Sequence, residues 1–265
     1  MTLNSRGTTA IDLSGKAVIV TGGTRGIGAA IARRYLEAGA DVLVCGRNEP
    51  ETLPAAGDRT AAFVQADVRQ PDQASRVIDG AVERFGRLDI LVNNAGGSPA
   101  ADAATVSPRF VTSIVTLNLL APFYLAQRAN AVMREQPEGG LILNIGSVAA
   151  RDPAPGTAAY AAAKAGLATL TRALALEFGP RVRVNQVTVG LVRTELAHLH
   201  YGDEEGIAAV ATTIPLRRMA VPDDVGYACL LLSSPLAGYV NGTELLVDGG
   251  GEVPARFLAA KPRTD

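Results

Sequence analysis

The sequence is poor in the residues that build disulfide frameworks and metal sites. Its 265 residues include only two cysteines, Cys45 and Cys229, and two histidines, His198 and His200. The cysteines lie far apart, each in an apolar run, so we expect two buried thiols in a reducing compartment. The histidines share one polar segment without cysteine partners, so we expect solvent-facing loop residues and no metal site.

An excess of charge of either sign is also missing. The chain has 25 basic and 26 acidic side chains and a net charge of -1, which argues against a nucleic-acid partner. The N-terminal stretch "MTLNSRGTTAIDLSGK" lacks the apolar core of a signal peptide. No apolar run reaches the ~18 residues that cross a bilayer, so we expect a soluble, cytoplasmic protein with no membrane partner.

Short β-rich runs alternate with longer helical stretches along the chain. The expected strands cover residues 17–21, 41–45, 62–66, 89–93, 141–145, 183–189 and 243–247, and the expected helices cover 26–38, 71–85, 107–134, 158–178 and 222–233. Several strands are apolar throughout, which is typical of strands covered on both faces. This alternation predicts an α/β Rossmann fold, a doubly wound parallel sheet of about seven strands with helices on both faces.

Two stretches stand outside this alternation. We expect one domain over residues 1–265, with a core at about 13–250, an N-terminal arm at 1–12 and a C-terminal tail at 251–265. Residues 191–215 have mixed polarity and contain "YGDEEG". An insertion of this kind after a strand predicts a lid over the site, with a solvated surface loop as the alternative.

A glycine-rich turn follows the first expected strand. In "TGGTRGIG", Gly22, Gly26 and Gly28 are spaced G-x-x-x-G-x-G, directly before an amphipathic helix. Glycines let the backbone turn sharply and approach a pyrophosphate closely, and the helix N-terminus offers free N–H groups and a positive dipole end. The position between strand and helix therefore predicts a dinucleotide site.

The end of the second strand indicates which dinucleotide is bound. An NAD site usually carries an acidic residue there for the ribose 2′-hydroxyl, but this chain has Gly46 and Arg47. A guanidinium suits a 2′-phosphate, and Arg25 in the glycine turn can assist from the other side. We predict NADP(H) rather than NAD(H), and the alternative is that both arginines are solvated surface charges.

Three polar residues are candidates for the chemistry. Tyr160 and Lys164 are four residues apart in "AAYAAAKAGLATL", so they project from one face of a helix. A nearby ammonium lowers a tyrosine pKa from its usual value of about 10 and makes the phenol a usable general acid–base. Ser147 ends the fifth strand, at the sheet edge where such folds bind ligands. Taken singly, the three could equally be a core aromatic, a solvated lysine and a helix cap.

Together these motifs resemble the short-chain dehydrogenase/reductase family from about Leu13 to Gly250. The motifs that carry the resemblance are "TGGTRGIG" (21–28), "NNAG" (93–96), Asn118 in "VTLNLLAPF", Ser147, "YAAAK" (160–164) and "NQVTVGLVRT" (185–194). The overall pattern is most similar to that of 3-oxoacyl-thioester reductases. The family's usual Pro-Gly after the sixth strand is Val189-Gly190 here, which loosens the backbone beside the nicotinamide because proline fixes φ.

The resemblance implies a role for each matching residue. Tyr160 would be the proton donor and acceptor, Lys164 would lower its pKa and hold the nicotinamide ribose, and Ser147 would orient the substrate carbonyl. Asn118 would hold a water that links Lys164 to solvent as a proton relay. The implied cofactor-binding residues are Gly22, Thr24, Arg25, Gly26, Ile27, Gly28, Arg47, Asp67, Val68, Asn94, Ala95, Gly96, Tyr160, Lys164, Gly190, Val192 and Thr194.

Some of these cofactor contacts are specific. Asp67 would meet the adenine amino group with Val68 beside it, and Ile27 would lie under the pyrophosphate. Residues 93–96 would support the sheet and pass beside the adenosine ribose. Val192 and Thr194 would hold the nicotinamide carboxamide.

The expected function is hydride transfer between NADP(H) and a ketone or secondary alcohol. Divergent enoyl reductases of the family have a wider Tyr–Lys spacing, so the four-residue gap favours carbonyl chemistry. A 3-oxoacyl thioester linked to CoA or a carrier is the expected substrate, and a steroid or other alicyclic alcohol is the alternative. A non-catalytic NADP-binding regulator is disfavoured because the three polar residues are all present. An extended-family sugar epimerase is disfavoured because the chain lacks a sizeable C-terminal substrate domain.

The resemblance also implies a homotetramer or homodimer. The helices near 107–134 and 158–178 would pair between subunits. The last strand and the helix before it would form the second subunit surface.

Overall fold

Seven parallel strands form the central sheet of the computed structural model, which describes residues 2, 3 and 9–254. They are β3 (Ala17–Thr21), β4 (Asp41–Gly46), β7 (Ala62–Gln65), β8 (Ile90–Asn93), β9 (Gly140–Ser147), β10 (Val182–Val189) and β11 (Glu244–Val247). Their order across the sheet is β11-β10-β9-β8-β3-β4-β7, and each neighbouring pair is parallel. The predicted doubly wound Rossmann sheet is confirmed.

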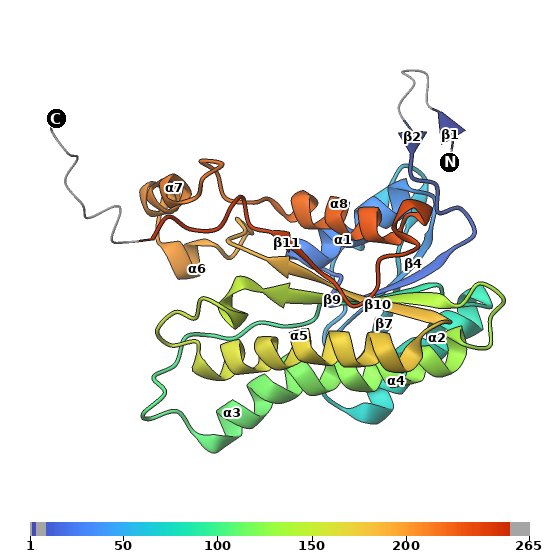
Figure 1. Ribbon diagram of the computed structural model, residues 1–265, viewed down its shortest axis with the longest axis horizontal. Coiled ribbons are helices and arrows are strands. Elements are labelled where there is room, and N and C mark those ends of the chain that lie inside the picture. The colour runs from blue at the N-terminus through green and yellow to red at the C-terminus, as the bar shows by residue number, and fades with distance from the viewer. Residues whose placement is uncertain (1, 4–8, 255–265) are drawn as a thin grey trace, which may run out of the picture.

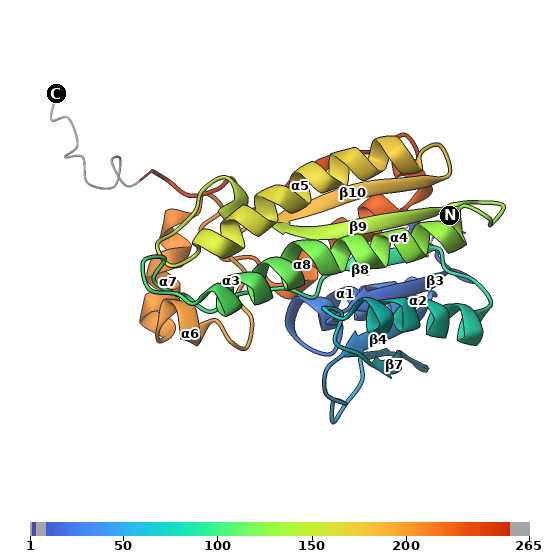
Figure 2. The same cartoon turned by 90° about the horizontal axis from the view of Figure 1, so that it is seen from below.

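Helices cover both faces of this sheet (Figures 1 and 2). On one face lie α1 (Gly26–Glu37) and α8 (Pro222–Ser233), and on the other lie α2 (Pro71–Phe85), α4 (Ala121–Met133) and α5 (Ala158–Phe178). Successive strand residues point to opposite faces, so Val18 and Val20 join one buried cluster and Ile19 joins the other. This two-sided burial explains why the strands are apolar throughout.

The helix predicted over 107–134 is interrupted at its centre. It consists of α3 (Pro108–Val115), a π-helical turn over Thr116–Leu120 and then α4. Pro122 has no N–H to donate to the carbonyl of Asn118, four residues earlier, and its ring would crowd that carbonyl in a regular α-helix. The wider turn removes this conflict, and it places Asn118 at full burial.

The run Pro108–Met133 is also long and apolar enough to cross a membrane by length and composition, with a mean hydropathy of 1.4 in its best window. The expectation that no stretch has this length therefore needs correction. Core helices of ordinary folds share this length and composition. Here α4 packs against α2 and the sheet, so this half of the run is one of the helices that cover the sheet.

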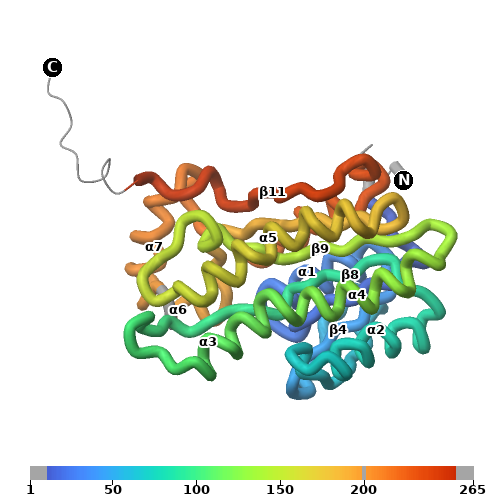
Figure 3. The backbone as a smooth tube through the Cα atoms, turned by 60° about the horizontal axis from the view of Figure 1, so that its bottom comes forward, coloured from blue at the N-terminus to red at the C-terminus, as the bar shows by residue number. Residues whose placement is uncertain are grey.

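Residues 191–215 contain two helices that the sequence analysis did not predict. They are α6 (His198–Tyr201) and α7 (Glu204–Thr213). The Asp203 carboxylate accepts a hydrogen bond from the Gly206 N–H and so caps α7. A small apolar cluster that includes Ile207 and Ile214 holds the segment together. Both helices lie at the carboxyl end of the sheet, near the starts of α3 and α5 (Figure 3).

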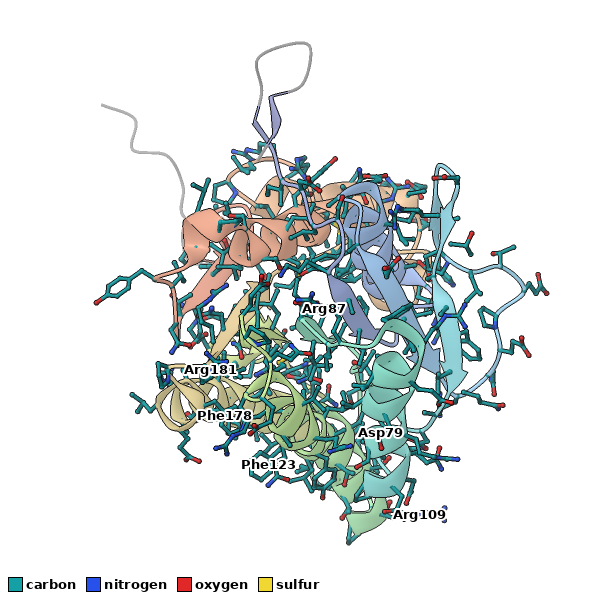
Figure 4. The ribbon with its side chains drawn as sticks, turned by 90° about the vertical axis from the view of Figure 1, so that its right-hand side faces the viewer. Asp79, Arg87, Arg109, Phe123, Phe178 and Arg181 are labelled. Atoms are coloured by element: carbon teal, nitrogen blue, oxygen red, sulfur yellow. The ribbon has the colours of Figure 1, made fainter. Side chains whose placement is uncertain are left out.

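The opposite end of the sheet is a network of polar contacts at the amino ends of the strands. Figure 4 views the molecule from that side, with Arg87 and Arg181 labelled. Asp89 accepts hydrogen bonds from the Arg87 guanidinium at 2.6 and 2.7 Å and from the Ala17 N–H at 2.9 Å. The side chain of Gln136 bonds both the N–H and the C=O of Leu88 at 2.8 Å. These contacts tie the strand starts together, far from the carboxyl ends.

Several short elements were not predicted either. They are the strand pairs β1 (Thr2–Leu3) with β2 (Thr9–Ala10) and β5 (Ala55–Ala56) with β6 (Arg59–Thr60), and the 3-10 turns Val148–Ala150 and Pro235–Ala237. Both cysteines are free and buried, as expected. His198 is exposed as expected, but it lies in α6 rather than in a loop. The expectations for the side chain of His200 and for the tail beyond 254 lie outside what the structure describes.

Candidate active site

The glycine turn forms a tight cradle at the start of α1. Gly22 and Gly26 have φ values of +61° and +53°, a region that L side chains rarely adopt. A Cβ on Gly28 would lie 2.3 Å from the carbonyl oxygen of Gly22 and 2.5 Å from the Asn94 amide nitrogen. The N-cap residue, Arg25, makes no side-chain cap, so the first N–H groups of α1 are available to bind a ligand. This donor set fits a pyrophosphate.

The segment 93–96 is fastened to the same cradle. The Asn94 side chain donates to the carbonyls of Thr21 and Gly22 at 2.8 and 3.2 Å. The Thr21 hydroxyl accepts from the N–H groups of Asn94 and Ala95, both at 3.0 Å. Strands β3 and β8 are neighbours whose connections leave in opposite directions, and open α/β sheets bind ligands at such a switch point.

A polar hollow of about 390 Å3 lies beyond the ends of β4 and β7. We call it the basic hollow, and it is lined by Arg47, Gln65, Ala66, Asp67, Gln73 and Arg76. The Thr24 side chain lies against Gly46, directly before Arg47, so the glycine turn and the basic hollow adjoin. Arg76 was not identified from the sequence, because only the fold brings α2 to the end of β4.

Asp67 is ionised and already engaged in the protein alone. The guanidinium of Arg69 holds its carboxylate through hydrogen bonds of 2.5 to 3.1 Å. These bonds lower the pKa of Asp67, and the charge of Arg47 adds to the effect. Val68 beside it is buried. Arg69 was missed by the sequence analysis, although its position two residues after Asp67 was a usable signal.

The candidate catalytic residues converge where β9 ends and α5 begins. Ser147 is the last residue of β9, and Tyr160 and Lys164 lie in the first turns of α5. Lys164 is buried, and its Nζ donates to the carbonyl oxygen of Ile145 at 2.7 Å. The same Nζ lies 5.7 Å from the centroid of the Tyr160 ring. Alanines on the buried side of α5 let the helix approach the sheet this closely.

Burial dominates the ionisation of this pair. It raises the pKa of the Tyr160 phenol, and a hydrogen bond with Ser147 lowers that pKa in part. Burial also lowers the pKa of Lys164 from 10.5 to about 8. The pKa of Tyr160 is therefore raised by burial, where the sequence predicted a decrease, because the apolar surroundings disfavour the charged forms of both side chains. A protonated Tyr160 at neutral pH can act as a proton donor.

Asn118 in the π-helical turn lies beside Lys164. Its Oδ1 accepts from the Gly97 N–H at 2.9 Å, and its Nδ2 donates to the carbonyls of Gly97 and Ile114 at 3.0 and 2.9 Å. A Cβ on Gly96 would lie 2.8 Å from Asn118 Oδ1 and 3.3 Å from Lys164 Nζ. A side chain at position 96 would therefore collide with Asn118 and crowd Lys164, so the position requires glycine.

The end of β10 approaches the site from the other side. Val189 lies in register with both Ser147 and Val247, so β10 stays in the sheet to its last residue. The family's usual proline at this position would have no N–H to donate. A Cβ on Gly190 would lie 2.7 Å from the Cβ of Asp248, which leaves room only for glycine. Val192 pairs with Ala220 in an isolated parallel bridge.

Thr194 and its successor lie over the glycine turn. The Thr194 hydroxyl accepts from the N–H of Leu196 at 3.3 Å. The Thr194 methyl and the Glu195 carboxylate are among the nearest atoms to a Cβ placed on Gly26, at 3.6 to 3.9 Å. The start of the 191–215 segment therefore covers the pyrophosphate cradle.

An apolar hollow of about 200 Å3 adjoins Tyr160. Its lining includes Val106, Phe110 and Val111 on one side and Ala158 and Ala159 beside Tyr160 on the other. None of the described residues that line this apolar hollow is charged. It can accept a hydrocarbon group next to the phenol.

Fold and site together define a dinucleotide-binding α/β oxidoreductase. The profile described as enoyl-(acyl carrier protein) reductase matches residues 22–252. 3β-hydroxysteroid dehydrogenase 1 of Eggerthella lenta is 38% identical over 247 residues, 90% of this chain and 94% of that protein. The 3-oxoacyl-[acyl-carrier-protein] reductase FabG of Chlamydia pneumoniae is 34% identical over 249 residues, 91% of this chain and 98% of that protein.

A solved structure also resembles this chain in fold and sequence. Aldohexose dehydrogenase of Thermoplasma acidophilum superposes with a TM-score of 0.86 at 30% identity and covers 96% of this chain and 100% of its own. The chain belongs to the short-chain dehydrogenase/reductase family. Members of this family bind nicotinamide cofactors and act on small molecules.

Proposed function

We propose that this chain is one NADP(H)-binding catalytic domain that interconverts a ketone and a secondary alcohol. The observation that carries the proposal is the convergence of Ser147, Tyr160, Lys164 and Asn118 next to the glycine cradle. A non-catalytic NADP-binding regulator would not need these four side chains around one point. Their arrangement is the reason to prefer an enzyme.

Each residue has one task in the proposed reaction. The bound nicotinamide supplies or accepts the hydride. The Ser147 hydroxyl donates a hydrogen bond to the carbonyl oxygen and orients it, and Tyr160 gives its proton to the same oxygen as negative charge develops there. The Lys164 ammonium holds the ribose hydroxyls and stabilises the phenolate that remains. Asn118 then connects Lys164 to solvent through a water, which restores the proton.

The preference for NADP(H) over NAD(H) rests on arginines. Arg47 lines the basic hollow at the ribose end, and Arg25 lies in the adjoining glycine turn. Replacement Arg47→Gln should weaken NADPH binding by roughly 10-fold or more, the value of a charge-assisted hydrogen bond, and leave NADH binding nearly unchanged. Fluorescence titration of both cofactors checks this, with Arg84→Gln on exposed α2 surface as the matched control. Equal affinity of the wild-type protein for NADH and NADPH would contradict the assignment.

A 3-oxoacyl thioester, linked to CoA or a carrier, is the substrate we propose. The apolar hollow beside Tyr160 supports a substrate with a hydrocarbon group next to its carbonyl, and the similarity to FabG points the same way. A steroid or other alicyclic alcohol is the second candidate, because the apolar hollow suits its rings and a hydroxysteroid dehydrogenase is a relative. The four-residue Tyr–Lys spacing supports carbonyl rather than C=C reduction.

A substrate panel tests this proposal. Short 3-oxoacyl thioesters, oxo-steroids, cyclohexanones, enoyl thioesters and aldohexoses would each be assayed with NADPH and NADH. The proposal predicts the highest kcat/KM for a thioester or alicyclic ketone with NADPH. Turnover confined to sugars or to enoyl thioesters would contradict it.

We also propose a cytoplasmic homotetramer or homodimer. Large apolar side chains are exposed along α8, the segment after it and the edge strand β11, namely Tyr227, Leu231, Leu236, Tyr239 and Leu246. Contiguous exposed apolar surface is typical of subunit contacts. On the other face of the sheet, Leu176 of α5 is exposed as well, which supports a second contact through the long helices.

A further inference from the structure

A row of polar side chains crosses the sheet just below the active site. Asn93 of β8, Asn144 of β9, Gln186 of β10 and Glu244 of β11 are in register with one another. Registered side chains of adjacent parallel strands point to the same face. On this face the level below is apolar, with Ile142 and Val184. The row therefore marks a change from apolar core to polar contacts near the carboxyl ends.

Hydrogen bonds connect this polar row directly from β8 to β9 and from β10 to β11, and through the Thr171 hydroxyl of α5 from β9 to β10. Asn93 Nδ2 donates to Asn144 Oδ1 at 2.9 Å, and Asn144 Nδ2 donates to the Thr171 hydroxyl of α5 at 2.9 Å. Gln186 Nε2 donates to Glu244 Oε2 at 3.2 Å. The last carboxylate reaches the surface, where Arg172 pairs with it at 3.0 Å. Burying a polar group costs free energy unless it is hydrogen-bonded, and within the described residues Asn93 Oδ1 is the member of this row that is buried without a partner.

Gln186 has a second contact that leads to the reacting centre. A Cβ on Gly146 would lie 2.4 Å from Gln186 Nε2 and 2.6 Å from its Cδ, so the Gln186 amide occupies the place of a side chain at position 146. The same Nε2 donates to the Thr188 hydroxyl at 2.9 Å, and Thr188 is in register with Gly146. In β9, the residue directly after Gly146 is Ser147.

Glu244 fixes which way this amide points. Its Oε2 accepts from Gln186 Nε2 and from the Thr188 hydroxyl at 3.1 Å. An ionised carboxylate only accepts hydrogen bonds, so the Gln186 nitrogen rather than the oxygen must face Glu244. The amide is thereby held in one orientation against Gly146.

We propose that Gln186 is a positioning residue for Ser147, with Glu244 as the group that orients it. The Gln186 amide braces the backbone at Gly146, and this brace aims the Ser147 hydroxyl at the substrate carbonyl. The inference rests on the proposed role of Ser147 in the reaction. It also connects the reacting centre to β11, the edge strand that carries part of the proposed subunit surface.

Replacement Gln186→Leu tests the brace. A shift of about 1 Å in a reacting group can cost 10²-fold in rate, so we expect kcat to fall by roughly 10- to 100-fold. The Kd for NADPH, measured by fluorescence, should stay within about twofold, because the cradle and the basic hollow belong to other strands. Gln136→Leu is the matched control at the far end of the sheet. It should lower the melting temperature and leave kcat unchanged.

A double-mutant comparison separates positioning from general weakening. In a Ser147→Ala background, Gln186→Leu should cost little further in kcat, because the group that it positions is already gone. Multiplicative losses in the double variant, or an unchanged kcat in folded Gln186→Leu, would overturn the inference. If Gln186→Leu does not fold, Gly146→Ala displaces the same amide from the opposite side and should give the same loss of kcat. Failure of Ser147→Ala itself to slow turnover would instead count against the proposed function.

Discussion

At the residue scale, the ionisation of Tyr160 depends on Ser147. Burial raises the pKa of Tyr160, and the hydrogen bond with Ser147 lowers it in part. In the proposed reaction, alcohol oxidation needs the phenolate, so its rate should rise with pH through the pKa of Tyr160. Without the Ser147 hydroxyl this pKa climbs further, so the alkaline rise moves to higher pH.

Replacement Ser147→Ala should therefore shift the pH profile of kcat/KM for alcohol oxidation upward. It should also lower the rate by roughly 10²-fold or more, as loss of an oxyanion donor does. A series of assays across the alkaline range measures both effects, with Ser234→Ala, a buried serine remote from the site, as the control. A profile that stays in place or moves to lower pH would show that Ser147 does not tune the phenol.

Residues of the site differ in how far the sequence predicted them. Tyr160, Lys164 and Ser147 were predictable because a helix spacing and a strand end fix their relative positions locally. Arg69, Arg76 and Gln186 were not, because their partners come from other elements and only the folded sheet brings them together. The net shift in the pKa of Tyr160 is upward rather than downward, since burial outweighs the other effects and could not be read from the spacing.

At the element scale, the sequence predicted the strands but missed the π-helical turn and the helices α6 and α7. Continuous apolar runs are typical of parallel strands buried on both faces, and here they alternate with helical stretches, so each of the seven strands was predicted. The π-helical turn was missed because its pattern resembles that of an ordinary helix, although Pro122 was a signal. Helices α6 and α7 were missed because α6 has only four residues and α7 only ten, too few to show a clear periodicity.

The segment with α6 and α7 should open more readily than the sheet. Its buried apolar cluster is small, comprising Ala197, Ile207, Ile214 and Met219, and weakly packed segments exchange their amide hydrogens fastest. Hydrogen exchange followed by mass spectrometry should show α7 exchanging well before β9, and bound NADPH should slow the exchange of α7. Equal protection of α7 and β9, unaffected by NADPH, would show that the segment is a fixed surface loop rather than a lid.

At the scale of the whole molecule, the sheet ends on one side at the edge strand β11. Within the part of the chain that the structure describes, strand β11 pairs with β10 alone, and apolar side chains around it are exposed. Light scattering coupled to size-exclusion chromatography should give the mass of a tetramer or a dimer. Leu231→Glu with Tyr239→Glu should reduce that mass, because charges would be buried in the contact, and Leu176→Glu tests the contact through α5 separately. A monomeric wild-type protein would contradict the proposed assembly.

The central claim is that Tyr160 transfers the proton while the glycine cradle holds the cofactor independently of it. The most direct measurement compares wild type and Tyr160→Phe for NADPH oxidation with the best ketone of the panel and for NADPH affinity. The account predicts that turnover falls by roughly 10²- to 10⁴-fold, the range of general acid–base catalysis, while the Kd for NADPH changes by no more than about threefold. Turnover in Tyr160→Phe close to that of the wild type would contradict it.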